Sequence, residues 1–110
     1  MNSVIRPRAR DDIIRQFRWY LVEQDASEVA FRFLAAVEET VADLLKMPEM
    51  GAPKATRNAA LAGLRVWPVC AFEDIRIYYL VREGTLTVVR ILHGKRDVDR
   101  VLKNEMFEEV

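Results

Sequence analysis

The spacing of apolar residues changes once along this chain, and this change limits the folds open to it. In residues 7–46 the apolar side chains recur every three or four positions, which is the period of an α-helix with one buried face. In residues 64–92 they form short runs rich in β-branched and aromatic residues, which are typical of strands. The chain is therefore predicted to have an α+β fold.

Two helices are expected in the first half of the chain. Pro7 suits the first position of a helix, where a missing N–H costs nothing. Asp25 and Glu28 have the spacing of a capping box, so the second helix is expected to begin near Asp25. Because only two or three residues separate the helices, they are predicted to form an antiparallel hairpin. The apolar stripes expected to face the core are Ile13, Ile14, Phe17, Tyr20 and Leu21 in the first helix, and Val29, Ala30, Phe33, Val37, Val41 and Leu44 in the second.

Strands are expected on both sides of this hairpin in the sequence. A short strand ends at residues 4–5, and strands at 64–69, 75–81 and 86–92 are predicted to form a three-stranded antiparallel meander. Pro68 cannot donate to a strand ladder, so its strand should lie at an edge or contain a bulge there. A final helix is predicted from Asp97 to about Glu108, with Val98, Val101, Leu102 and Phe107 facing inward.

A two-residue turn at Glu83 and Gly84 would fix the pairing of the last two strands. Counting outward from this turn pairs Arg82 with Thr85, Leu80 with Thr87, Tyr78 with Val89 and Arg76 with Ile91. One face then carries the apolar set Ile75, Ile77, Tyr79, Val81, Leu86, Val88 and Leu92, and the other, open face carries Arg76, Tyr78, Arg82 and His93. Arg90 falls on the apolar face, where the sequence offers it no evident partner.

Length and composition exclude several classes of protein. The chain has 110 residues, 51% hydrophobic and 31% charged, which suits one soluble domain over residues 1–110 and is too short for a Rossmann or TIM-barrel enzyme. The single cysteine excludes an internal disulfide. The charged N-terminus is unlike a secretory signal, and no apolar run reaches the ~18 residues of a membrane span, so we expect a cytoplasmic protein without membrane contact. One histidine, one cysteine and scattered glycines lead us to expect neither a metal nor a cofactor.

Five segments, taken in order, resemble the RelE/ParE superfamily of bacterial toxins from type II toxin–antitoxin pairs. They are PRARDDI, MPEMGAP, LAGLRVWPV, IRIYYLV and VVRILHGKRDVDRVL. Each segment is a weak signal alone, but their order and spacing are specific and cover nearly the whole chain. The resemblance implies one RelE/ParE-like domain with the strand, helix hairpin, meander and C-terminal helix described above.

The superfamily divides by target, so the resemblance implies one of two activities. RelE-like members are ribosome-dependent nucleases that cut messenger RNA, whereas ParE-like members share the fold, lack the catalytic set and poison DNA gyrase. Carried over by position, the RelE-like cations would be Arg65, Arg76 and Arg96, and His93, the only imidazole in the chain, would be the proton-transfer group of that alternative. The catalytic tyrosine of the terminal helix would fall at or near Leu102, which cannot transfer a proton. We therefore expect a ParE-like gyrase inhibitor with no catalytic residues, and the mRNA endoribonuclease is the alternative.

Two groups of residues are predicted to meet partners. The first group consists of cations on the strands and on the turn after the last strand, namely Arg65, Arg76, Lys95 and Arg96. We expect these side chains to lie close together and to bind the target. The expected target is gyrase, and the alternative is the ribosome with mRNA. Pairing of some of these cations with Glu73, Asp74, Asp97 or Asp99 is the alternative to target binding. The resemblance also implies an antitoxin that wraps the helices and the sheet in a hetero-oligomer. Trp19, which lies off the apolar stripe, is expected to contact it together with Arg15 and Arg18.

Overall fold

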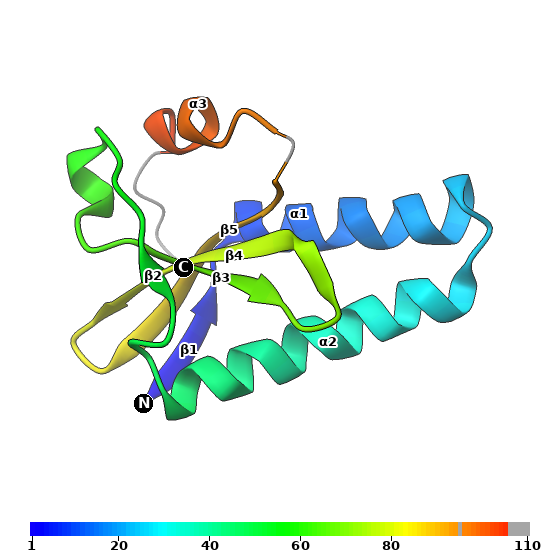
Figure 1. Ribbon diagram of the computed structural model, residues 1–110, viewed down its shortest axis with the longest axis horizontal. Coiled ribbons are helices and arrows are strands. Elements are labelled where there is room, and N and C mark those ends of the chain that lie inside the picture. Colours follow the sequence, from blue (N-terminus) through cyan, green and yellow to red (C-terminus); the bar gives the residue numbers. More distant parts are fainter. Residues whose placement is uncertain (95, 106–110) are drawn as a thin grey trace.

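The helix-then-strand pattern produces a helical hairpin packed on a mixed sheet (Figure 1). The computed structural model describes residues 1–94 and 96–105. Its strands are β1 (Asn2–Ile5), β2 (Ala52–Pro53), β3 (Arg65–Val69), β4 (Phe72–Arg82) and β5 (Thr85–His93), and its α-helices are α1 (Pro7–Arg18), α2 (Ser27–Lys46) and α3 (Val98–Lys103). The sheet order is β1-β5-β4-β3-β2, with β1 parallel to β5 and the other neighbours antiparallel. The predicted α+β fold, helix hairpin and meander are confirmed.

The connection between the two long helices differs from the predicted capping box. Helix α1 begins at Pro7 as expected, and it continues into one turn of π-helix, η1 (Trp19–Glu23). Asp25 does not cap α2; Ala26 is the N-cap residue and makes no side-chain cap. Asp25 instead has a φ of 47°, a left-handed backbone that Asp tolerates better than most residues, so it serves the turn rather than the helix.

A β-bulge changes the pairing of β4 with β5. Arg82 pairs with Thr85 and Leu80 with Thr87, as the two-residue turn predicts. Beyond Tyr79 the register shifts by one residue, because β5 carries an extra residue there. The predicted pairs Tyr78–Val89 and Arg76–Ile91 are therefore wrong, and the observed pairs are Tyr78–Arg90, Ile77–Ile91, Arg76–Leu92 and Ile75–His93.

The bulge also reassigns side chains to the two faces of the sheet. Since side chains alternate along a strand, Ile91 rather than Leu92 joins Ile75 and Ile77 on the face covered by α1 and α2. We call this the hairpin face. His93 lies opposite Ile75 on the hairpin face, so the prediction that it shares a face with Arg76 is wrong.

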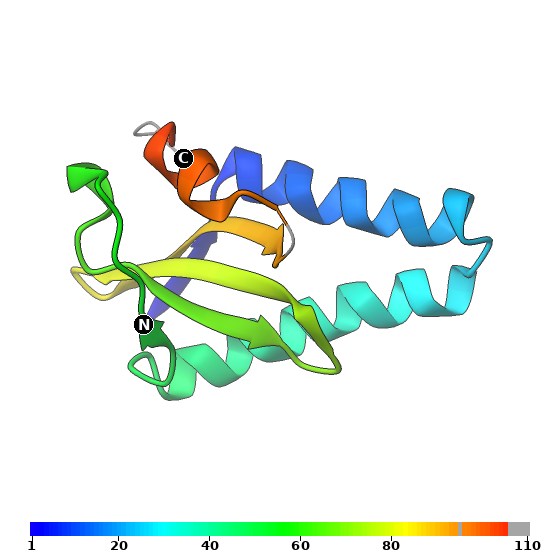
Figure 2. The ribbon, with the colours of Figure 1, turned by 45° about the horizontal axis from the view of Figure 1, so that its top comes forward.

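The other face is not open, contrary to the sequence prediction. Tyr78, Leu80 and Val89 are buried there against Leu61, Leu64, Leu92 and Leu102. We call it the α3 face, because α3 and the segment of residues 54–64, which includes the 3-10 turn η2 (Ala59–Leu61), cover it (Figure 2). The side-chain amide nitrogen of Asn58 donates to the backbone carbonyl oxygens of Leu102 (2.9 Å) and Glu105 (2.6 Å). These hydrogen bonds join the segment of residues 54–64 to the end of α3.

Helix α3 is shorter than predicted. It begins after Asp97, whose carboxylate accepts from the backbone N–H of Arg100 (3.2 Å), and it ends at Lys103 rather than near Glu108. Glu105 turns inward instead of continuing the helix and is buried beside Arg90. Phe107 lies outside the described residues.

Arg90 finds the partners that the sequence alone does not reveal. Its guanidinium donates to both carboxylate oxygens of Asp12, from Nε at 2.7 Å and from Nη2 at 2.9 Å, and Nη1 donates to Glu105 (3.0 Å). The hydrogen bond to Asp12 raises the pKa of Arg90 above its ordinary value, although burial acts in the opposite direction. The network joins α1, β5 and the segment after α3.

The expectation for Pro68 is confirmed. Strand β2 pairs only with Arg65 and Val66, so Pro68 lies beyond it on an unpaired stretch of the edge. The pairing of β3 with β4 also shifts register between Pro68 and Val69.

Candidate partner-binding surfaces

The predicted target-binding cations do not form one cluster. Arg76 and Arg96 do come together, around a pocket of about 300 Å³ on the α3 face that Lys54 and Tyr78 also line. Lys95 lies outside the described residues. Within the part of the chain that the structure describes, neither Arg76 nor Arg96 forms an ion pair with Glu73, Asp74, Asp97 or Asp99. This pocket therefore holds two exposed guanidinium groups without an ion pair among the described residues, and the carboxylates of Asp97 and Asp99 line it as well.

Arg65 lies away from this pocket, so the prediction that it joins the other cations is wrong. It pairs with Tyr79 across the strands, which directs its side chain to the hairpin face. Its Nη1 donates to the carbonyl oxygens of Gly51 (2.7 Å) and Glu49 (3.2 Å). The side chain thus holds the loop after α2 in place.

The residues of the alternative nuclease site are also separated. His93 lines a pocket beside α1 on the hairpin face, whereas Arg76 and Arg96 line the pocket on the α3 face. A general acid or base must lie within hydrogen-bond reach of the atoms whose protons it moves. Because of the bulge in β5, His93 and Arg76 project to opposite sides of the sheet.

Sequence reasoning missed a second set of cations near Arg96. Lys54, Arg57, Arg100 and Lys103 line a pocket of about 790 Å³ between α3 and the segment that covers the α3 face. Lys54 Nζ lies 2.9 Å from a carboxylate oxygen of Asp99. No local pattern signals this group, because Asn58 brings together segments more than 40 residues apart in the chain.

The residues predicted to contact an antitoxin do lie together. Arg15, Arg18 and Trp19 line one side of a hollow of about 510 Å³ on the outer surface of α1 and η1, with Asp11, Ile14, Val22 and Glu23. Trp19 is 46% exposed and Val22 is 64% exposed. Ile14 was expected in the core stripe but is 49% exposed, because Asp12, not Ile14, turns toward the sheet to bind Arg90.

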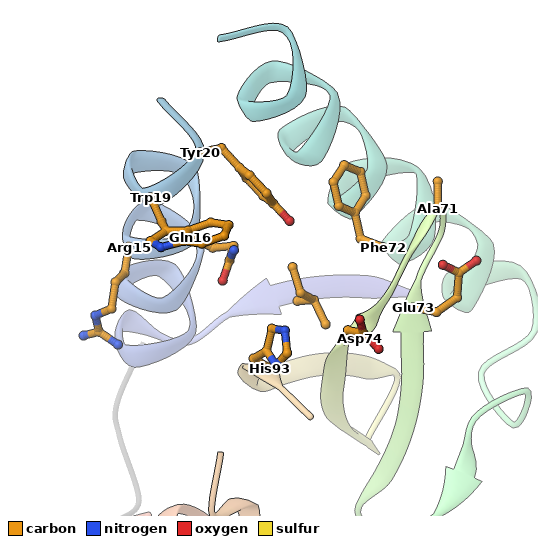
Figure 3. Close-up of a pocket in the computed structure, with 10 residues that line it drawn as sticks. Arg15, Gln16, Trp19, Tyr20, Ala71, Phe72, Glu73, Asp74 and His93 are labelled. Atoms are coloured by element: carbon orange, nitrogen blue, oxygen red, sulfur yellow. The ribbon is translucent and has the colours of Figure 1, made fainter. Parts of the chain in front are cut away.

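A second pocket beside Trp19 lies between α1 and the turn that joins β3 to β4 (Figure 3). It has a volume of about 590 Å³ and is lined by Arg15, Gln16, Trp19, Tyr20, Ala71, Phe72, Glu73, Asp74, Ile75 and His93. Burial raises the pKa of Tyr20, and the negative charge of Asp74 adds to this increase, whereas a hydrogen bond with Gln16 lowers it. Aromatic rings and carboxylates thus meet in one cavity.

Comparison with known proteins decides the family. The chain matches, over residues 4–98, the family described as the ParE toxin of the type II toxin-antitoxin system, parDE. The protein belongs to the ParE toxin family. No curated protein sequence matches it. A solved structure, described as the chromosomal ParDE TA system from P. aeruginosa, has the same fold as this ParE-family chain, with a TM-score of 0.66. The two are 19% identical, and the match covers 84% of this chain and 95% of the other.

Neither a membrane span nor a metal site is found in this ParE-family protein among residues 1–94 and 96–105. None of the helices there is long and apolar enough to cross a bilayer. The described His, Cys, Asp and Glu residues form no group of three or more that could hold a metal ion.

Proposed function

We propose that this protein is a toxin that arrests bacterial growth in the cytoplasm by poisoning DNA gyrase, and that an antitoxin neutralises it by binding. Membership of the ParE toxin family supports this proposal. The observation that carries the choice of target is the separation of His93 from Arg76 and Arg96 by the sheet, since an mRNA nuclease needs its proton-transfer group beside its phosphate-binding cations.

The proposed gyrase-binding surface is the pocket that Arg76 and Arg96 line on the α3 face. Both guanidinium groups are exposed, and arginine binds carboxylates and phosphates through two parallel hydrogen bonds. Lys95 directly precedes Arg96 in the sequence, and we include it in the proposed gyrase-binding surface on that ground alone. We leave Arg65 out, because its guanidinium is already bonded to the carbonyl oxygens of Glu49 and Gly51.

Two reactions distinguish the proposed target from the alternative. Purified protein is incubated with gyrase and relaxed plasmid, and in parallel with translating ribosomes and mRNA. We expect inhibited supercoiling or cleaved plasmid in the first reaction and intact mRNA in the second. Cleavage of mRNA at specific codons without any effect on gyrase would overturn the proposal.

The role of the two arginines is tested with matched variants. Arg76→Ala and Arg96→Ala should each raise the concentration needed for half-maximal gyrase inhibition at least fivefold. Arg32→Ala, which removes an exposed arginine of α2, should leave it unchanged. A chain truncated after Glu105 keeps the ion pair with Arg90 and tests whether residues 106–110 contribute to the contact. If the arginine variants inhibit fully and the truncated chain does not, gyrase is bound by the C-terminal segment instead.

A further inference from the structure

The pocket between α1 and the β3–β4 turn combines two kinds of group that bind organic cations. The first is aromatic: the Tyr20 ring lies 5.3 Å from that of Trp19 and 5.8 Å from that of Phe72, measured between ring centroids. The second is acidic, since Glu73 and Asp74 line the pocket beside Phe72. Aromatic faces attract lysine, arginine and other organic cations, and a nearby carboxylate strengthens the attraction.

The acidic groups of the pocket are not neutralised by the cation next to them. Arg15 lines the same pocket, but its guanidinium points away from it (Figure 3) and lies 3.6 Å from a carboxylate oxygen of Asp12. Within the described residues, neither Glu73 nor Asp74 forms an ion pair. The pocket therefore places two carboxylates that form no ion pair within the described residues next to aromatic rings.

The walls of the pocket are held in place before any ligand arrives. The Phe72 ring packs edge-to-face on the buried Phe33 at 5.5 Å. The hydroxyl of Thr40 in α2 accepts a hydrogen bond from the backbone N–H of Cys70 (3.0 Å), which fixes the turn that carries Phe72. Asp74 accepts at its carbonyl oxygen from the backbone N–H of Gly94 (2.7 Å). Such preorganisation reduces the free energy that binding spends on ordering the site.

We propose that this pocket receives an arginine side chain of the antitoxin, with the guanidinium stacked on Tyr20 or Phe72 and hydrogen-bonded to Asp74. Arginine fits better than lysine, because its planar group stacks on aromatic rings and donates two hydrogen bonds to one carboxylate. The exposed Trp19 borders both this pocket and the hollow on the outer surface of α1, so a bound segment can cover both. The inference rests on the proposed neutralisation by an antitoxin and names the side chain that the site selects.

A small-molecule titration tests the pocket without the antitoxin. N-acetyl-arginine amide is added to the protein and compared with N-acetyl-citrulline amide, which has nearly the same shape and no charge, while NMR follows the two tryptophan indole N–H signals. We expect a saturable shift at Trp19, no shift at Trp67, and at least fivefold weaker binding of the citrulline probe. Asp74→Asn should weaken binding of the arginine probe at least fivefold, and Glu38→Gln, at an exposed position on α2, should not. Equal binding of both probes, or an unchanged affinity in Asp74→Asn, would overturn the proposal.

A second measurement tests the occupant. The affinity of the protein encoded beside this one is measured by calorimetry for the unchanged chain, for Asp74→Lys and for Glu38→Lys. A loss of more than tenfold in Asp74→Lys alone supports the proposal. Equal affinity of all three chains overturns the pocket as the antitoxin contact but leaves neutralisation intact. If the encoded neighbour binds none of them, neutralisation by that protein fails, and the arginine titration still decides whether the pocket selects a cation.

Discussion

The two faces of the sheet are covered by different means. On the hairpin face, long helices bury aliphatic and aromatic side chains such as Phe33 and Leu44 against Ile77 and Tyr79. On the α3 face, a six-residue helix and an irregular segment cover a smaller apolar cluster. That covering is fastened largely by polar contacts, from Asn58 to the end of α3 and from Arg90 to Glu105.

This difference predicts that the coverings of the two faces are lost under different conditions. Apolar burial over a long helix is non-directional and is lost only when the helix leaves the sheet. A covering that depends on a few hydrogen bonds is lost when one partner is removed, because the remaining buried polar group is left unsatisfied. We therefore expect the α3 face to open locally under conditions in which the hairpin face stays closed.

The largest effect expected is from truncation on the hairpin face. Phe33→Ala should lower the free energy of unfolding by about 3–5 kcal/mol, because the rigid surroundings cannot fill the space left by the ring. Leu102→Ala, on the α3 face, should cost about 2–3 kcal/mol, at the low end for buried leucine, since a short helix can move toward the sheet. Urea denaturation measures both. A larger loss for Leu102→Ala would contradict the comparison.

Removal of the ion network should cost nearly as much and should act on the α3 face. Arg90→Ala leaves the buried carboxylates of Asp12 and Glu105 without their main cation, so we expect a loss of about 3–5 kcal/mol in the free energy of unfolding. Arg76→Ala is the matched control, with an expected loss under ~1 kcal/mol because this arginine is exposed. Hydrogen exchange in α3 should accelerate in Arg90→Ala before exchange in α2 does. Equal acceleration in both helices would show that the two faces open together.

A smaller effect is expected where the hairpin face relies on polar contacts. The hydroxyl of the buried Tyr79 accepts from the backbone N–H of Gly51 (2.9 Å) and donates to the carbonyl oxygen of Pro48 (2.8 Å). Tyr79→Phe should lower the free energy of unfolding by about 1–3 kcal/mol, since both backbone groups lose their partner. Gly51→Ala tests the same contact from the other side, because a methyl group there would overlap the Tyr79 ring. A fully stable Gly51→Ala variant would contradict this packing.

The smallest effect concerns alkaline pH and involves one tyrosine on each face. Burial raises the pKa of Tyr79 and of Tyr78, although nearby hydrogen bonds or cations oppose the shift. A raised pKa in the folded state means that each contribution to stability is complete below about pH 10 and is lost as pH rises through the folded-state pKa. Urea unfolding at pH 8, 10 and 11 should show the decline, and Tyr79→Phe should reduce it. A stability that stays constant up to pH 11 would contradict the raised pKa values.

Local patterns predicted most of the fold, and long-range polar contacts account for what they missed. The period of apolar residues located the helices and the strands, and Gly84 identified the turn between β4 and β5. The bulge at Val89 has no local signature, because it accompanies the bonds of Arg90 to Asp12, 78 residues away. One inserted residue then reversed the faces assigned to Arg90, Leu92 and His93, and Arg90 lies opposite Tyr78 on the α3 face rather than on the apolar face predicted for it.

The candidate sites were predictable to different degrees for the same reason. Arg15, Arg18 and Trp19 lie on one helical segment, so sequence spacing was enough to place them together. The cation pocket of Arg76 and Arg96 depended on strand alternation, which separated Arg65 from it. The pocket beside Phe72 lies between α1 and a turn more than 50 residues later in the chain. Sequence spacing does not show that two segments so far apart are neighbours in the fold.

The parallel pairing of β1 with β5 has a consequence for how the protein is made. Asn2 lies opposite Thr85 and Ile5 opposite Val88, so the first strand synthesised acquires its neighbour only when about four-fifths of the chain exists. Pairings between residues so far apart form late, because the long intervening loop must first be ordered. During translation α1 and α2 are synthesised before β5, so the helical hairpin can form while β1 still lacks its neighbouring strand. The complete sheet, and every surface built on it, can therefore form only after β5 has been synthesised.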